Sequence, residues 1–313
     1  MSGRADAGGW RLRALVWSVA FSAVGYLAVA IWSGWHDVVR AMYQVGATGL
    51  ATALALSLLN YALRFARWRL YLGAMGHRLP ARSNLRIYLS GFALTTTPGK
   101  AGELFRGVLL KPLGVPHSHS IAAFFSERLS DLLAVVLLAL AALSLYPQAR
   151  VPVAGGAAVV LLGLLLLSHE RLLRQLEVDI SGGGRVRRLL GYGVSALLQA
   201  RRCHTPRLLL AASALALIGW SAEALAFHLI LQWIGVEIGL AAAVGIFSIA
   251  IIAGALSLSP GGLGSTEGVM AGLLLWQGVS GADAVAATVL IRLVTLWFAT
   301  AIGATLLVMQ RIR

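Results

Sequence analysis

Apolar stretches of about 20 residues recur along almost the whole of this 313-residue chain. Because a helix rises about 1.5 Å per residue, such a stretch crosses the hydrocarbon core of a bilayer, which is roughly 30 Å thick. Only 12% of the residues are charged, about half the share of a soluble domain, and no polar block is long enough to form one. The sequence therefore predicts an all-α polytopic membrane protein without a soluble catalytic domain.

Six stretches are long enough to be full spans. They cover approximately residues 14–34, 47–66, 119–146, 151–168, 207–234 and 283–309. The first has a basic front like that of a signal peptide, but it is long for one and lacks a clear cleavage site, so we interpret it as a retained span. Two shorter apolar stretches, 84–97 and 241–258, each run into a Pro-Gly motif and are followed by a short amphipathic piece, at about 102–113 and 265–277.

Each interrupted segment is either one broken crossing or a re-entrant hairpin that returns to its starting side. Arginines cluster in 64–86 and in 170–207, and cytoplasmic loops carry the excess of Lys and Arg. Both clusters lie inside only if the segment between them, 84–113, is a hairpin. This interpretation places both termini in the cytoplasm, leaves only Arg40 and Arg150 on outer loops, and makes the second hairpin enter from the opposite face.

The net charge of +14 would suggest a nucleic-acid partner in a soluble protein. Here the cations flank apolar spans, so they fit orientation signals and attraction to anionic lipid headgroups better. We therefore expect membrane lipids as partners and no nucleic acid.

The two interruptions share a sequence pattern. PGKAGE begins at Pro98 and is matched by PGGLGSTE, which begins at Pro260. In both cases 25 residues separate the motif's glutamate from an arginine inside the following span. We therefore predict two inverted-topology repeats, A at about 47–146 and B at about 207–309, joined by a basic cytoplasmic loop with an amphipathic helix at about 169–206.

Proline and glycine at membrane depth end the incoming helix, and the freed backbone survives only where protein or water satisfies it. A helix that starts behind each break, near Gly102 and Ser265, would point its first amides and its positive dipole end at a cavity, and such ends bind phosphate and carboxylate groups. Alternatively, the glycines only allow tight turns and close packing, and Glu103 and Glu267 complement their own helix ends. Each carboxylate could also be a placeholder that leaves, or takes a proton, when an anionic headgroup arrives.

Several ionisable residues fall inside predicted spans. Each costs roughly 2.5–3.5 kcal/mol at a helix centre, so lipid-facing positions are disfavoured. In one interpretation they form structural ion pairs that lock the repeats together. In the other, Arg128 and Arg292 clamp a headgroup phosphate in a bidentate way. Lys100, Arg106 and the Arg64/Arg67 pair would then line the path from the cytoplasmic leaflet, although Arg64 and Arg67 could instead be snorkelling anchors at a helix end.

These arguments define a set of candidate residues. The candidate headgroup-binding residues are Pro98, Gly99, Lys100, Gly102, Glu103, Arg106, Arg128, Pro260, Gly261, Gly262, Gly264, Glu267 and Arg292, with Glu127, Asp131, Glu223 and His228 as intramembrane ionisable support. We find no ATP-binding, kinase or hydrolase motif, and we expect no catalytic residue and no cofactor. His117 and His119 lack a nearby carboxylate, so we expect no metal, and Cys203 as the only cysteine excludes an intrachain disulfide.

The segments TPGKAGELFRGVLL, SERLSDLLAVVLLAL and SPGGLGSTEGVMAGLLL resemble the flippase-like transmembrane domain of lysylphosphatidylglycerol synthases and its stand-alone relatives. The resemblance covers essentially the whole chain. It implies a bacterial inner-membrane location and a role in moving a lipid across the bilayer. Family members that make lysyl lipids carry an additional soluble aminoacyl-transferase domain. This chain stops at Arg313 just after its last span, so the resemblance does not imply aminoacyl transfer here.

We therefore predict a lipid translocase that moves an anionic phospholipid or a polyprenyl-phosphate-linked lipid, such as a lipid-linked sugar. The main alternative is a non-transporting membrane partner that presents a lipid acceptor to an envelope-biosynthesis enzyme, a glycosyl- or acyl-transferase. A third hypothesis is an intramembrane enzyme that uses Glu127, Asp131 or Glu223 as acid or base. The oligomeric state stays open.

Overall fold

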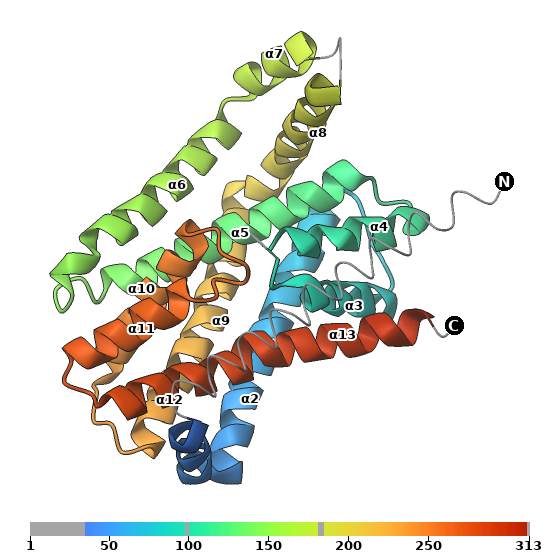
Figure 1. Cartoon of the computed structure of the whole chain (residues 1–313). Coiled ribbons are helices and arrows are strands. Elements are labelled where there is room, and N and C mark those ends of the chain that lie inside the picture. Colours follow the sequence, from blue (N-terminus) through green and yellow to red (C-terminus); the bar gives the residue numbers. More distant parts are fainter. Residues whose placement is uncertain (1–34, 98–99, 181–184, 312–313) are drawn as a thin grey trace.

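The computed structural model describes residues 35–97, 100–180 and 185–311. Helices are the regular structure throughout these ranges (Figure 1), so the prediction of an all-α protein is confirmed. Within the described ranges, four helical segments are long and apolar enough to cross a membrane, namely Trp35–Ala74, Arg150–Ser168, Pro206–Trp233 and Gly281–Met309. The predicted first span at 14–34 lies outside the described residues, as do Pro98 and Gly99.

The elements follow one another in a simple order. The long helices are α2 (Trp35–Ala74), α5 (His117–Leu140), α6 (Arg150–Ser168), α9 (Pro206–Trp233) and α10 (Leu240–Leu256), together with the run α12 (Gly281–Arg292), the π-helical turn η6 (Leu293–Trp297) and α13 (Phe298–Arg311). Shorter helices are α3 (Ala81–Ser90), α4 (Arg106–Leu110), α7 (Glu170–Ile180), α8 (Arg185–Ala200) and α11 (Ser265–Trp276). Single 3-10 turns are η1 (Gly91–Leu94), η2 (Ala101–Phe105), η3 (Lys111–Leu113), η4 (Pro147–Ala149) and η5 (Arg201–His204).

Two of the predicted spans differ in length from the observed helices. The segment 35–46, expected to be a loop, is helical and joins the next span at a kink where Gly46 has φ 65°, a conformation that costs glycine little. In α5 the helix ends at Leu140, earlier than the expected end at 146. Hydropathy and helix propensity therefore predict that a helix is present more reliably than they predict its first and last residues.

The first interrupted segment resumes as a short helical run. After η1 the chain reaches Lys100 in the left-handed conformation, with φ 56°, and then passes without a gap through η2, α4 and η3, from Ala101 to Leu113. The short piece predicted at about 102–113 is therefore helical, but its first and last turns are 3-10 turns and only Arg106–Leu110 is α-helical.

The second interrupted segment has the predicted shape. Helix α10 ends at Leu256, a turn with left-handed residues follows, and α11 starts at Ser265. Leu258 has φ 53°, which is rare for a residue with a side chain and marks a backbone held by its surroundings.

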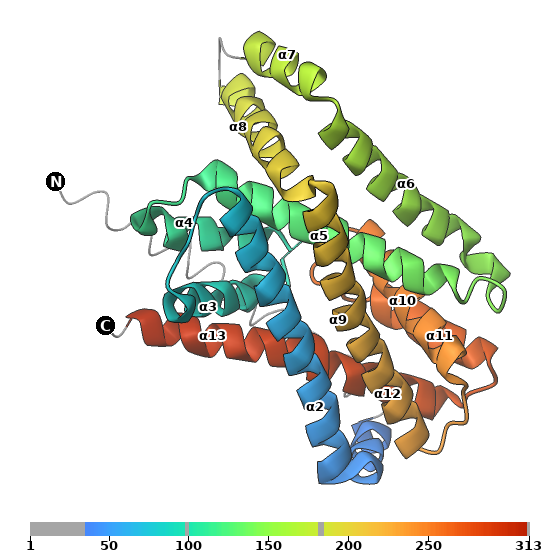
Figure 2. The ribbon, with the colours of Figure 1, turned by 180° about the vertical axis from the view of Figure 1, so that it is seen from behind.

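The two interrupted segments pack across the molecule (Figures 1 and 2). The incoming half of the first, α3 and η1, packs against α13, and the incoming half of the second, α10, packs against α5. The outgoing halves, α4 and α11, pack against the helices that follow them, α5 and α12. Helices α2 and α9 pair with each other. As a result the two breaks meet, and a Cβ placed on Gly261 would lie 3.2 Å from the Cα of Thr96.

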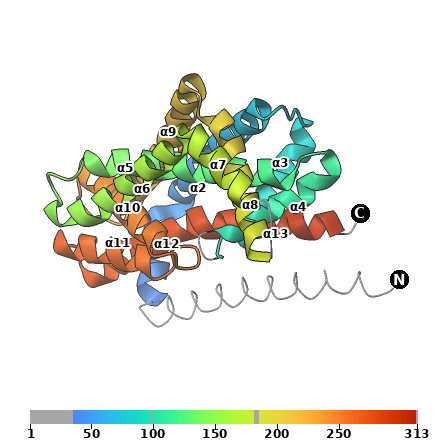
Figure 3. The same cartoon turned by 90° about the horizontal axis from the view of Figure 1, so that it is seen from above.

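The connections separate onto two sides of the helical bundle. Helices α3 and α4 and the C-terminal part of α13 lie on one side, and the α5–α6 and α11–α12 connections lie on the other (Figures 1 and 3). Arg69, Arg78, Arg82 and Arg86, on the first side, are exposed. Arg64 and Arg67 are buried, so they do not serve as the surface anchors that were one expectation for them.

We predict that Pro112, in η3, and Val279, before α12, face opposite aqueous phases. The variants Pro112→Cys and Val279→Cys, each in a Cys203→Ser background, should react with a membrane-impermeant maleimide from opposite sides of sealed vesicles. Labelling of both sites from one side would contradict the arrangement of two hairpins from opposite faces.

Candidate functional site

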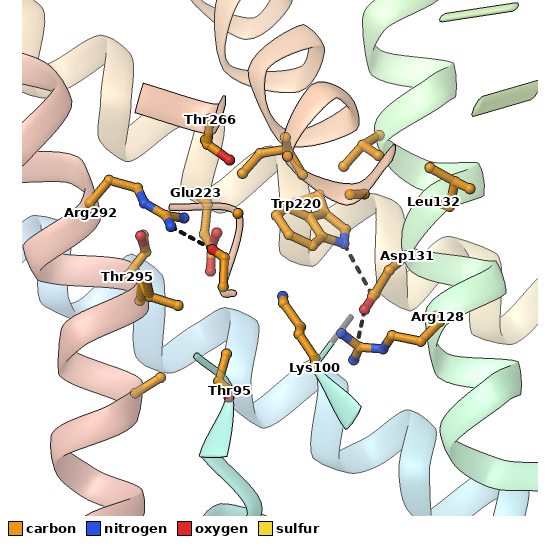
Figure 4. Close-up of a pocket in the computed structure, with 18 of the residues that line it drawn as sticks. Thr95, Lys100, Arg128, Asp131, Leu132, Trp220, Glu223, Thr266, Arg292 and Thr295 are labelled. Atoms are coloured by element: carbon orange, nitrogen blue, oxygen red, sulfur yellow. Dashed lines mark hydrogen bonds and ion pairs between the residues drawn. The ribbon is translucent and has the colours of Figure 1, made fainter. Parts of the chain in front are cut away.

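A cavity of about 280 Å³ lies where the two interrupted segments meet (Figure 4). Its cationic walls are Arg64 from α2, Lys100 from the first break, Arg128 from α5 and Arg292 from α12. Asp131 on α5 and Glu223 on α9 are its carboxylates, and the remaining wall is largely apolar. Four cations and two carboxylates therefore line the cavity.

The first break brings a buried carboxylate behind this cavity. Glu103 is 1% exposed and pairs with Arg106, while guanidinium nitrogens of Arg64 and Arg128 lie 3.9 and 3.8 Å from its Oε2. The Thr95 hydroxyl donates a hydrogen bond to Oε1 at 3.1 Å. One carboxylate thus positions two of the cations that reach the cavity.

Arg106 and Glu127 form a buried pair away from the cavity wall. A guanidinium nitrogen of Arg106 lies 2.9 Å from Glu127, and the Tyr88 hydroxyl donates to the same carboxylate at 2.9 Å. The guanidinium also lies over the rings of Tyr88 and Trp68, 4.4 and 5.1 Å from their centroids. The prediction that Arg106 lines a path from the leaflet is therefore wrong, because the short turn of η2 directs its side chain into the protein core.

Asp131 connects three helices at the cavity wall. Its oxygens lie 2.5 Å from Arg67 on α2 and 3.0 Å from Arg128 on its own helix. The indole N–H of Trp220 on α9 donates to it at 3.1 Å. Arg67 is fully buried, so it belongs to this structural pair and lines no path.

The second break is closed by one arginine. The Nε of Arg292 donates to Glu267 at 2.6 Å and its Nη2 donates to the Gly261 carbonyl at 2.7 Å. Glu267 in turn accepts the Gly264 N–H at 2.8 Å and caps α11. The cap occupies an amide that was expected to bind an external anion, so the alternative that Glu267 complements its own helix end is correct.

In both halves of the chain, the glutamate of the motif lies close to the arginine 25 residues further on. Glu267 and Arg292, the second pair, are hydrogen-bonded. Glu103 and Arg128, the first pair, are 3.8 Å apart, and Arg128 is closer to Asp131. The two pairs are equivalent in sequence position and differ in contact.

Some motif glycines allow turning and close packing. Gly261, Gly262 and Gly264 all have positive φ values, which explains the glycine-rich turn before α11. A Cβ on Gly102 would lie 2.5 Å from the Leu94 Cβ, and the Gly102 N–H donates to the Thr97 hydroxyl at 2.6 Å. The packing role of these glycines is therefore correct, while Pro260 lies in the turn itself.

Glu223 and His228 differ in their positions on α9. Glu223 lines the cavity and accepts a hydrogen bond from the Asn60 amide. His228 is buried outside the cavity wall. Asn60, Arg64 and Arg67 lie on one face of α2 with a spacing of four and then three residues, and this helical periodicity is the signal that could have found Asn60.

No cluster of three or more His, Cys, Asp or Glu residues that could hold a metal ion occurs in the described ranges. His119, which we considered for metal binding, makes a ring nitrogen contact of 2.7 Å with His77.

The chain is similar over most of its length to a family and to membrane proteins of other organisms. The family model described as "Lysylphosphatidylglycerol synthase TM region" matches residues 15–303. A UPF0104 membrane protein of Methanothermobacter thermautotrophicus is 30% identical over 305 residues, which cover 91% of this chain and 90% of the relative. A UPF0104 membrane protein of Pyrococcus horikoshii is 23% identical over 312 residues, with coverages of 90% and 92%. The similarity therefore includes both interrupted segments and the cavity.

We predict that Arg106→Gln destabilises the protein strongly, because it leaves the buried Glu103 and Glu127 without their shared cation. Loss of one partner from a buried ion pair costs about 3–5 kcal/mol. Arg40→Gln is the control, since the pairs that Arg40 makes with described residues, Asp37 and Asp283, are exposed and worth about 0–1 kcal/mol. Denaturant unfolding in detergent measures both, and equal stability of the two variants would contradict the structural role of Arg106.

Proposed function

The chain belongs to the lysylphosphatidylglycerol synthase transmembrane family, and from this premise we propose that it is a lipid translocase. It moves an anionic phospholipid or a polyprenyl-phosphate-linked lipid between the leaflets of the membrane. The headgroup occupies the cavity between the two breaks, and the acyl or prenyl chains remain in lipid.

Unpaired guanidinium donors in the cavity carry this proposal. The Nε atoms of Arg64 and Arg128 and the Nη2 atom of Arg64 are buried and make no hydrogen bond to the protein in the described part of the chain. A buried donor without a partner carries a desolvation cost, and a guanidinium recovers it best with a phosphate or carboxylate. Together with the excess of cations over carboxylates, these atoms favour an anionic ligand.

The size of the cavity supports a headgroup rather than a whole lipid. Its volume of about 280 Å³ lies at the lower end for small-molecule sites, roughly 300–1,000 Å³. A phosphate with a small polar substituent fits such a space, whereas lipid chains do not. The chains therefore stay outside, where the surrounding bilayer accommodates them at no hydrophobic cost.

We propose that the chain contains two inverted repeats and that the interrupted segments gate the cavity alternately. The reciprocal packing of each incoming half against the last helix of the other repeat supports this arrangement. In this structure Arg292 is in contact with Glu267 at 2.6 Å, whereas Arg128 lies 3.8 Å from Glu103. In the opposite state Arg128 closes on Glu103, and Arg292 leaves Glu267.

The proposed location is the plasma membrane, the inner membrane in a bacterial cell, with both termini in the cytoplasm. The exposed arginines around α3 support this orientation. No chemical step is assigned to the carboxylates, because Glu127 lies away from the cavity and Asp131 contacts two guanidiniums. The family membership agrees with a membrane domain that binds and moves its ligand.

The test of this function combines binding and movement. Native mass spectrometry of protein from phosphatidylglycerol-containing membranes should retain an anionic lipid, and proteoliposomes should move fluorescent phosphatidylglycerol or a fluorescent polyprenyl phosphate. Arg64→Gln, Arg128→Gln and Arg292→Gln should each weaken retention by roughly 10–100-fold, since a charge-assisted hydrogen bond contributes about 1.5–3 kcal/mol. Arg40→Gln is the matched control, because Arg40 does not line the cavity and forms exposed pairs with Asp37 and Asp283.

The outcomes separate the hypotheses. Retention that is equal in all four variants would contradict the headgroup site. Retention without any movement of either lipid, together with copurification of a glycosyl- or acyl-transferase, would favour the lipid-presenting partner instead.

We also predict that Glu267→Gln opens the second break by weakening its bond to Arg292. Ser259, which lines the cavity beside this break, provides the readout as Ser259→Cys in a Cys203→Ser background. Its labelling from the side of the α11–α12 connection should become several-fold faster in Glu267→Gln. Labelling of Pro112→Cys should not change, and an unchanged rate at Ser259→Cys would contradict the closing role of the second pair.

A further inference from the structure

Glu223 differs from the other carboxylates at the centre of the molecule because its hydrogen-bond partner is a neutral amide and not a guanidinium. Glu103, Glu127, Asp131 and Glu267 each contact at least one guanidinium within 4 Å. Glu223 has no cation within this distance in the described residues, and its carboxylate accepts a hydrogen bond from the neutral Asn60 amide. It is nevertheless buried, 6% exposed, and lines the cavity.

The surroundings of Glu223 are otherwise apolar or engaged elsewhere. On its own helix, the Trp220 indole is committed to Asp131. On α2, the Tyr61 hydroxyl donates to the Thr295 carbonyl. The part of α10 that faces the cavity contributes Ile251, Gly254 and Ala255, which supply no charge. A buried carboxyl without a cationic partner favours its neutral form, whereas a nearby cation favours the carboxylate.

Charged groups around the cavity can reverse this preference. They are Arg64 on α2, Lys100 at the first break, Asp131 on α5 and Arg292 on α12. A headgroup phosphate that engages the cations removes their attraction for Glu223 and adds a like charge. Its departure frees the cations again. The protonation of Glu223 is therefore linked to the occupancy of the cavity by electrostatics alone.

We propose that Glu223 is a proton-binding site that couples lipid movement to the proton gradient. A proton from water on the loading side binds the Glu223 carboxylate when the headgroup binds. It is carried as the carboxylic acid while the interrupted segments exchange states. It leaves to water on the other side with the headgroup, so one proton accompanies one anionic lipid in the same direction.

This inference rests on the proposed function and adds its driving force. Intramembrane carboxyl groups are a common means of proton coupling in membrane transporters. The position of Glu223 is suited to the role, because it faces both breaks across the cavity (Figure 4). Asn60 holds the carboxyl in place in either protonation state, since its amide donates to an oxygen that is present in both.

The experiment uses the full chain in proteoliposomes that carry a trace of fluorescent phosphatidylglycerol, with the membrane potential clamped to zero. A gradient of about one pH unit corresponds to about 1.4 kcal/mol per proton. The labelled lipid should therefore accumulate in the leaflet on the alkaline side by up to about tenfold. Reversal of the gradient should reverse the accumulation.

Glu223→Gln supplies the matched variant, because the glutamine carbonyl still accepts from Asn60 and cannot lose a proton. It should abolish the gradient-driven accumulation of the labelled lipid. Asn60→Ala removes the hydrogen bond and leaves the carboxyl, so it should keep a dependence on the gradient.

The outcomes distinguish this inference from the proposed function. If wild-type protein moves the lipid with no dependence on the gradient, proton coupling is refuted and the translocase stands. If Glu223→Gln still accumulates lipid along the gradient, another group binds the proton and the assignment to Glu223 is refuted. If wild-type protein neither retains nor moves lipid, the proposed function itself fails.

Discussion

The pairing of buried charges is the interaction on which this structure depends. A bilayer offers no water to a guanidinium or a carboxylate, and each isolated charge at a helix centre costs roughly 2.5–3.5 kcal/mol. The chain therefore holds Arg106 between Glu103 and Glu127, and Arg67 against Asp131. These contacts join the first interrupted segment to α5 and join α2 to α5. Specific ion pairs fix helices that would otherwise pack against lipid as readily as against each other.

The interrupted segments follow from the same constraint applied to the backbone. Carbonyl and amide groups freed at a break need partners at membrane depth. Arg292 binds the Gly261 carbonyl, and Glu267 accepts the Gly264 amide. The first break uses neutral groups instead, with the Thr97 hydroxyl accepting from the Gly102 amide. In the second break the Gly261 carbonyl therefore depends on the Arg292 side chain for its hydrogen bond.

Hydropathy and charge predict the class of fold and the location of the breaks, because length and apolarity are properties of single segments. The spacing of 25 residues indicates that the motif repeats, and the structure brings each motif glutamate within 4 Å of the arginine 25 residues further on. The spacing does not predict the contacts of Arg106, since these depend on Tyr88 and Glu127 from two other elements. The piece expected at 102–113 is helical, but the sequence pattern does not reveal that its first turn, where Leu94 and Thr97 pack against Gly102, is a 3-10 turn. The partner of Glu223 is likewise a tertiary contact between α2 and α9.

Four cations and two carboxylates line the cavity, and Glu103 and Glu267 behind it lie within 4 Å of three of these cations. A buried guanidinium donor that these carboxylates leave without a hydrogen bond is costly unless a ligand compensates it. Arg64 is oriented by Glu103 at 3.9 Å yet keeps unpaired donors, so the carboxylate positions the guanidinium without saturating it. In the proposed translocase, such a guanidinium would bind a headgroup phosphate less tightly than a free guanidinium, because Glu103 already interacts with it. Weaker binding would favour release of the headgroup as well as its capture.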